Sequence, residues 1–144
     1  MKNILFVCTG NSARSIIAET IINNEHNDKF RAYSAGSNPT GKINNNIKKF
    51  LETKNYDLSN VSSKNFDTFI NSEIKMDHVI TVCNNANKEV CPIWPKKNQI
   101  IHWDIEDPLK IIDSTQNLSM KLKIVEKTYK DINKRILELF NYVS

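Results

Sequence analysis

Four short apolar runs along the chain alternate with segments whose apolar residues recur at helical spacing. The runs occupy residues 4–7, 30–35, 77–82 and 99–103, and each has the length of a buried strand. Segments 13–24 and 43–51 instead place apolar residues three or four positions apart, as on one face of a helix. The alternation predicts an α/β fold of three layers, a four-stranded parallel sheet with helices on both faces.

Two further helices are expected in the second half of the chain. Apolar residues at positions 66, 69 and 70 predict a short helix, with Ser62-Ser63 as its cap. Between residues 118 and 139 the apolar residues recur at alternating steps of four and three. At the end of a chain this pattern indicates a helix packed on the sheet rather than a coiled coil. The dipeptide Asp107-Pro108 is expected to mark a loop.

Composition and charge exclude several classes of protein. A length of 144 residues with 40% hydrophobic residues predicts one globular domain, residues 1–144. The net charge of +4 comes from scattered lysines without a basic block, so no nucleic-acid partner is expected. The apolar runs are too short for a signal peptide or a membrane span, and we expect a cytoplasmic monomer that does not bind membranes. Three cysteines in a reducing compartment are not expected to form a structural disulfide framework.

Residues 7–15, Val-Cys-Thr-Gly-Asn-Ser-Ala-Arg-Ser, carry the strongest functional signal. They form the turn between the first strand and the first helix, where backbone N–H groups and the positive end of the helix favour an anion. Cys8 lies in this turn and Arg14 follows six residues later, a setting that stabilises a nucleophilic thiolate. Gly10 and Asn11 tolerate the left-handed backbone that lets N–H groups converge, and Ser15 either donates a hydrogen bond to Cys8 or caps the helix. The expected oxyanion-binding residues are Thr9, Gly10, Asn11, Ser12, Ala13, Arg14 and Ser15.

Two other polar positions follow predicted strands. Cys83 comes directly after the third strand, and Asp107 lies in the loop after the fourth. Because the carboxyl ends of parallel strands share one edge, both are expected near Cys8. Cys91 is eight residues beyond Cys83, about 12 Å away if the segment between them is helical. A disulfide needs Cα atoms about 5.5–6 Å apart, so a bond between them requires this Asn-rich segment to unwind. A zinc site is not expected, because the thiols lack a C-x2-C spacing.

These motifs resemble the low-molecular-weight protein tyrosine phosphatase superfamily, and within it the thioredoxin-coupled arsenate reductases. The resemblance spans residues 2 to about 140 and rests on residues 8–15, Ser34-Ala35-Gly36, Cys83, Cys91-Pro92 and Asp107-Pro108. It implies a four-stranded parallel sheet flanked by helices and arsenate as the substrate, with phosphate and sulfate as competing anions. It also implies thioredoxin as the electron donor, and neither a bound cofactor nor a metal.

The resemblance further implies three successive displacements. Cys8 attacks arsenate held by the loop and Arg14, while Asp107 protonates the leaving hydroxide. Cys83 then attacks the Cys8 sulfur and releases arsenite. Cys91 finally attacks Cys83, and thioredoxin reduces the resulting Cys83–Cys91 disulfide.

Two same-site alternatives remain open at the level of sequence. One is a low-molecular-weight protein tyrosine phosphatase or another phosphomonoesterase that uses Cys8 and Asp107. Against phosphotyrosine, Leu109-Lys110-Ile111 stands where phosphatases typically carry tyrosines after the Asp-Pro step. The other is a non-catalytic oxyanion sensor or phosphocarrier, which would need neither Arg14 nor the two distal thiols.

Three further residues carry expectations of their own. Lys64 stands where some members of the superfamily place an aspartate of a potassium site, so we expect activity that is insensitive to potassium. His102 is expected to support the loop of Asp107 at the end of a strand. Trp94 is expected to pack in the core.

Overall fold

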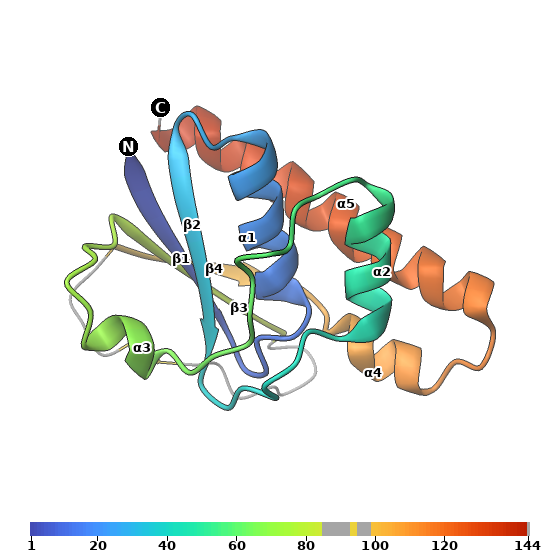
Figure 1. Cartoon of the computed structure of the whole chain (residues 1–144). Coiled ribbons are helices and arrows are strands. Elements are labelled where there is room, and N and C mark those ends of the chain that lie inside the picture. The colour runs from blue at the N-terminus through green and yellow to red at the C-terminus, as the bar shows by residue number, and fades with distance from the viewer. Residues whose placement is uncertain (85–92, 95–98, 144) are drawn as a thin grey trace.

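The centre of the fold is a sheet of four parallel strands in the order β2-β1-β3-β4 (Figure 1). The computed structural model describes residues 1–84, 93–94 and 99–143. The strands are β1 (Lys2–Cys8), β2 (Phe30–Gly36), β3 (His78–Cys83) and β4 (Gln99–Asp104). This confirms the predicted four-stranded parallel sheet. Each strand ends one residue later than expected, because the residue at the turn still belongs to the ladder: Cys8 pairs with Gly36, and Cys83 pairs with Asp104.

Helices cover both faces of the sheet. They are α1 (Arg14–Glu25), α2 (Asn45–Thr53), α3 (Asp67–Ile70), α4 (Pro108–Asp113) and α5 (Leu118–Val143). In Figure 1, α1, α2, α4 and α5 lie on one side of the sheet and α3 lies on the other. This arrangement explains why the two central strands, β1 and β3, are nearly continuous apolar runs: helices cover both faces of these strands.

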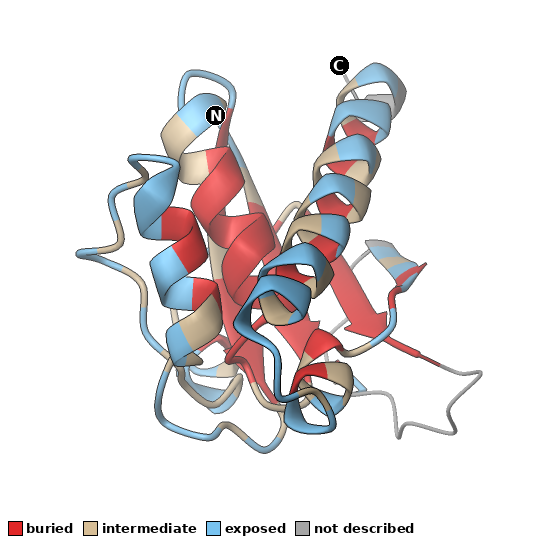
Figure 2. Cartoon of the chain, turned by 90° about the vertical axis from the view of Figure 1, so that its right-hand side faces the viewer, coloured by how far each residue is buried: buried red, intermediate tan, exposed pale blue. Residues whose placement is uncertain are grey.

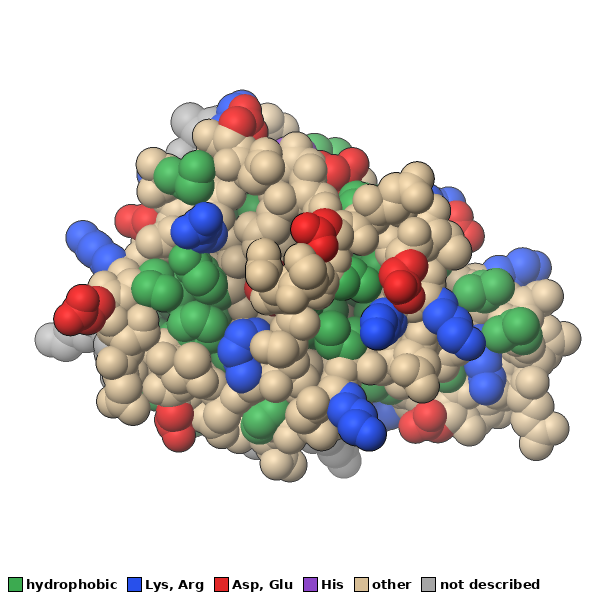
Figure 3. Space-filling view, in the orientation of Figure 1, with side chains coloured by type: hydrophobic (Ala, Val, Ile, Leu, Met, Phe, Trp, Pro, Cys, Tyr) green, Lys and Arg blue, Asp and Glu red, His purple; other side chains and the backbone are tan. Residues whose placement is uncertain are grey.

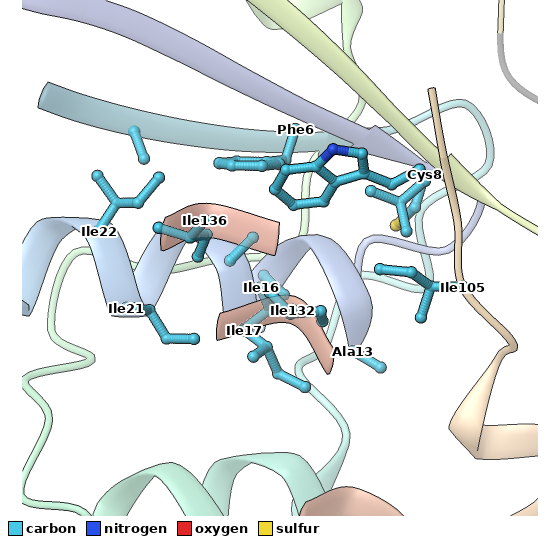
Figure 4. Packing of buried hydrophobic residues seen from close by; sticks show 14 of the residues in the cluster. Phe6, Cys8, Ala13, Ile16, Ile17, Ile21, Ile22, Ile105, Ile132 and Ile136 are labelled. Carbon is cyan, nitrogen blue, oxygen red and sulfur yellow. The ribbon is translucent and has the colours of Figure 1, made fainter. Parts of the chain in front are cut away.

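Alternate residues of the strands belong to two separate cores. Phe6 and Cys8 on β1 share a core with Val82 and Trp103, on the side of α1 and α5. The residues between them on β1 point to the α3 side, where the core contains Leu5, Val7, Ala35, Phe69, Met76, Val79 and Trp94. The prediction that Trp94 packs in the core is confirmed. Figure 4 shows Cys8 at the end of the first core, beside Ile105 and above the start of α1.

One local expectation was wrong. The short helix begins at Asp67 and receives no side-chain cap, and Ser63 Oγ instead lies 3.3 Å from the Gly10 carbonyl oxygen. Asp107 lies in the loop after β4, as expected, whereas Pro108 already begins α4, a helix that the sequence pattern did not predict. Asp107 caps this helix by accepting the Leu109 N–H at 3.0 Å, and Pro108 occupies the first helical position, where a missing N–H costs nothing.

The predicted C-terminal helix is present as α5. It was expected to pack on the sheet, and it packs mainly along α1 and α2 through a buried stripe that includes Val125, Ile132 and Ile136. In Figure 2 this stripe faces the sheet and the opposite side of α5 is exposed. The stripe is shorter than the sequence suggested, since Leu118 and Leu122 are 66% and 43% exposed. On the face in Figure 3, basic and acidic side chains are interspersed. Within the described ranges, no helix combines the length and the hydropathy needed to cross a membrane.

Candidate active site

The turn between β1 and α1 is closed by a left-handed residue. Asn11 has φ of 47°, a conformation that asparagine adopts more readily than most residues. The φ of Gly10 is not positive. The expected left-handed backbone is therefore found at Asn11 but not at Gly10. The turn brings the loop back over the end of β1, and α1 starts directly behind it at Arg14.

Residues 37–44, which follow β2, orient the peptide groups of this loop. Their backbone N–H groups donate to four loop carbonyls at 2.9–3.1 Å, those of Cys8, Thr9, Gly10 and Ser12. In a planar trans peptide the next N–H points opposite to the carbonyl. The N–H groups that follow these carbonyls are therefore directed away from residues 37–44, and that of Asn11 donates to the Cys8 sulfur. The sequence offered a signal for this segment, since the turn at residues 36–41 follows a strand and lies at the same edge of the sheet.

The Cys8 sulfur has two hydrogen-bond partners, the backbone N–H of Asn11 and the hydroxyl of Ser15. Cys8 is a free thiol, 2% exposed; the Asn11 N–H donates to Sγ at 3.1 Å, and Ser15 Oγ lies 2.8 Å from Sγ. The Lys64 backbone N–H donates to Asn11 Oδ1 at 2.9 Å, which leaves Asn11 Nδ2 to donate to Ser15 Oγ at 2.8 Å. A thiolate can only accept, so when Cys8 acts as a nucleophile the Ser15 hydroxyl donates to Sγ.

Arg14 supplies the positive charge beside this sulfur. It is the first residue of α1 and only 4% exposed. Its Nη1 donates to the Ile105 carbonyl at 2.9 Å, and its Nη2 lies 3.8 Å from Asp107 Oδ2. No side chain caps the start of α1, and its first turn contains no acidic residue. The helix N-terminus and the guanidinium together form a site for an anion.

Asp107 faces this site from the start of α4, its side chain 22% exposed. The pocket has a volume of about 470 Å³ and is lined by residues 8–14 together with Asn38, Thr40, Asp107, Leu109 and Lys110. The structure thus brings Cys8, Arg14 and Asp107 to one cavity. Asn38 and Thr40 were not expected there from the sequence. These two residues line the cavity because residues 37–44 are hydrogen-bonded to the loop.

Cys83 does not reach this cavity in the conformation described. It is disulfide-bonded and 0% exposed, and its Sγ lies 3.8 Å from both ring nitrogens of His102. His102 Nδ1 is 3.1 Å from Thr81 Oγ1, on the sheet face opposite to Cys8. The contacts of His102 therefore point to Cys83 rather than to the loop of Asp107. Cys91 lies outside the described residues.

A buried acid lies behind the loop. Glu19 on α1 is 4% exposed and accepts the Ser34 hydroxyl at 2.5 Å. Burial raises the pKa of Glu19 from its ordinary 4.5 to about 7, and the Ser34 hydrogen bond and the charge of Lys64 oppose this shift. Burial also lowers the pKa of Lys64, whose Nζ donates to the Ser62 carbonyl at 2.5 Å. No pattern in the sequence indicates that Glu19 is buried, because its burial depends on the packing of α1 against β2.

Comparison with known proteins places these features in a family. Residues 3–144 match the low molecular weight phosphotyrosine protein phosphatase family. An arsenate reductase of Bacillus cereus (strain 03BB102) is 39% identical over 107 residues, covering 74% of this chain and 77% of that protein. An arsenate reductase of Bacillus anthracis (strain CDC 684 / NRRL 3495) is 38% identical over 107 residues, with the same two coverages of 74% and 77%.

Solved structures share the fold. A thioredoxin-dependent arsenate reductase of Corynebacterium glutamicum has a TM-score of 0.63 and 23% identity, covering 99% of this chain and 63% of that one. An arsenate reductase in the phosphate binding state has a TM-score of 0.68 and 22% identity, covering 96% of this chain and 98% of that one. With a matching segment that spans nearly the whole sequence, and with the strand, anion loop and helix in place, the chain belongs to the low molecular weight phosphotyrosine protein phosphatase family.

Proposed function

We propose that the protein reduces arsenate to arsenite, with Cys8 as the nucleophile. The observation that carries the proposal is that one molecule holds a free thiol in an anion loop and a second cysteine, Cys83, in a disulfide. A phosphatase needs only the first of these, whereas a reductase needs thiols that can give up electrons. The curated relatives at 38–39% identity are arsenate reductases, which supports the same reaction.

In the first step, the Cys8 thiolate attacks arsenic and a hydroxide leaves. The loop N–H groups and Arg14 hold the arsenate oxygens, because donors fixed in advance stabilise the charge of the transition state. Asp107 gives its proton to the leaving oxygen. Its position at the mouth, 3.8 Å from Arg14 Nη2, suits a group that meets the oxyanion from the side opposite to Cys8.

Cys83 and Cys91 then supply the two electrons that reduce arsenic and are oxidised to a disulfide, which thioredoxin reduces. Cys83 attacks the Cys8 sulfur, arsenite leaves with the electron pair, and a Cys8–Cys83 disulfide remains until Cys91 displaces Cys8. Because Cys83 lies on the other face of the sheet here, this scheme requires the end of β3 to rearrange when Cys83 is reduced. Dependence on thioredoxin places the enzyme in the reducing cytoplasm.

A phosphatase acting on phosphotyrosine fits the pocket less well. Leu109 and Lys110 line the cavity beside Asp107, and no aromatic ring lies among its described lining residues. An aryl ester would therefore lack a stacking partner there. A small, multiply charged inorganic anion needs no aromatic stacking partner.

The decisive experiment couples the protein to thioredoxin, thioredoxin reductase and NADPH, with and without arsenate. We expect arsenate-dependent NADPH oxidation that disappears in Cys8→Ser, and slows in the presence of phosphate or sulfate. If the rate of NADPH oxidation is the same with and without arsenate, and the protein rapidly hydrolyses an aryl phosphate, the protein is a phosphatase instead.

Trapped disulfides test the order of the relay. After addition of arsenate to the reduced protein, Cys91→Ser should stop at a Cys8–Cys83 disulfide. Cys83→Ser should form no intramolecular disulfide that involves Cys8. Peptide mapping by mass spectrometry identifies the bonds. A Cys8–Cys91 bond in Cys83→Ser, or the absence of a Cys8–Cys83 bond in Cys91→Ser, would contradict the order.

A further inference from the structure

The sulfur of Cys83 has no direct access to water. Cys83 is 0% exposed at the end of β3, yet His102 on the neighbouring strand β4 is exposed. The distance from Cys83 Sγ to each ring nitrogen of His102 is 3.8 Å. His102 therefore connects a buried sulfur with solvent.

The position of the imidazole is set by the sheet. Thr81 pairs with His102 in the ladder, and Thr81 Oγ1 lies 3.1 Å from Nδ1. Cys83 follows Thr81 by two residues, so the two side chains share the face to which His102 points. A histidine held between a threonine hydroxyl and a sulfur is placed to move a proton rather than to fill space.

We propose that His102 gives protons to, and takes protons from, the buried Cys83 sulfur during disulfide exchange. The inference rests on the proposed function, in which Cys83 carries electrons from an external dithiol to Cys8. Its physical basis is that a thiolate buried without a proton donor or a positive partner is costly. His102 removes this cost in both directions of the exchange.

In the reductive direction, a thiolate of the dithiol attacks the sulfur that is bonded to Cys83. A mixed disulfide forms, the original S–S bond breaks, and its electron pair remains on Cys83 Sγ. Protonated His102 gives a proton to this sulfur and becomes neutral. The second thiol of the dithiol then attacks the first, so that the dithiol leaves as a disulfide and the protein has gained two electrons. When Cys83 later acts as the nucleophile, neutral His102 accepts the thiol proton.

Few other titratable groups face this site among the described residues. On β3, the side chain that shares this face with Cys83 is Thr81, which carries no charge. On β4, the nearest titratable group besides His102 is Asp104, two residues further along on the same face. Among these groups, His102 is the one whose ring nitrogens lie 3.8 Å from the Cys83 sulfur. The described geometry thus assigns the transfer to His102.

The test measures disulfide reduction by dithiothreitol in the oxidised protein, without arsenate, between about pH 5.5 and pH 8.5. Quenched alkylation followed by mass spectrometry gives the rate at which the Cys83 thiol appears, and each rate is divided by the thiolate concentration of the reductant. In the unmodified protein this normalised rate should fall as pH rises, because protonated His102 is lost. His102→Gln should be at least about 10-fold slower at the acidic end and independent of pH. His26→Gln, at the end of α1, should match the unmodified protein.

An unchanged profile in His102→Gln would overturn the inference. A rate lowered by one factor at every pH would overturn it too, since that result describes a structural role. Because arsenate is absent, the assay is independent of the proposed function. If the protein shows no arsenate-dependent turnover but keeps the His102-dependent pH profile, the proposed function is wrong and the inference about His102 stands.

Discussion

Replacing Glu19 by glutamine should abolish the part of the pH dependence of the free energy of unfolding that comes from the Glu19 carboxyl group. Glutamine keeps the oxygen that accepts the Ser34 hydroxyl but cannot titrate. Because burial raises the pKa of Glu19 from 4.5 to about 7, the folded state holds this proton more tightly than the unfolded chain. The resulting stability is complete below pH 4.5 and is lost as the pH rises through 7.

The magnitude follows from the two pKa values. Between about pH 5 and pH 8 the contribution of Glu19 to the free energy of unfolding falls by about 2.5 kcal/mol. For a domain of this size the loss corresponds to a decrease in Tm on the order of 5–10 °C. Since Glu19 is 4% exposed, solvent screens this effect little.

Urea unfolding monitored by circular dichroism at both pH values measures the effect. The difference in free energy of unfolding between Glu19→Gln and the unmodified protein should change by about 2.5 kcal/mol across this range, in favour of the glutamine variant at pH 8. Glu52→Gln, at an exposed position of α2, is the control and should show little change. A Glu19→Gln protein that keeps the pH dependence of the unmodified protein would refute the reasoning, and would mean that Glu19 does not titrate in this interval.

Three further changes test the loop. Ser15→Ala should lower the rate at which iodoacetamide alkylates Cys8 at about pH 6 by about 10- to 100-fold, because it removes a hydrogen bond to the thiolate. Gly36→Ala should destabilise the fold by about 1–3 kcal/mol in urea, since the added Cβ would lie 2.5 Å from the Thr9 carbonyl oxygen. Replacing sodium by potassium at constant ionic strength should leave the KM for arsenate unchanged, because the Lys64 ammonium already provides a positive charge near Glu19.

Each of these has its own control. Ser114→Ala removes an exposed hydroxyl at the end of α4 and should alkylate at the original rate; equal slowing in both variants would exclude the direct contact. Gly10→Ala places its Cβ no closer than 3.5 Å to other atoms and should cost less stability than Gly36→Ala. A clear decrease in KM with potassium would show that a cation site persists beside Lys64.

Local patterns were sufficient for the strands and for the anion loop. An apolar run followed by Cys8, a left-handed residue and Arg14 at the start of a helix is a strand–turn–helix unit whose geometry depends on adjacent residues. The contacts of Ser15 and Asn11 with Cys8 arise within this one turn, and the sequence could indicate the first of them. The parallel sheet followed from the alternation of strands and helices.

Only the tertiary structure decided how distant segments complete the site. The loop is held by hydrogen bonds from the backbone N–H groups of residues 37–44 and of Lys64, which are tens of residues away in the sequence. No periodic pattern in the sequence predicts these hydrogen bonds. The face on which Cys83 lies depends on where β3 ends, because a strand changes face with every residue. Cys83 is still paired in the ladder, with Asp104 as its partner, so it shares the face of Thr81 and His102 and lies opposite to Cys8. Local sequence thus determined which side chains could react, whereas register and long-range packing decided which of them meet.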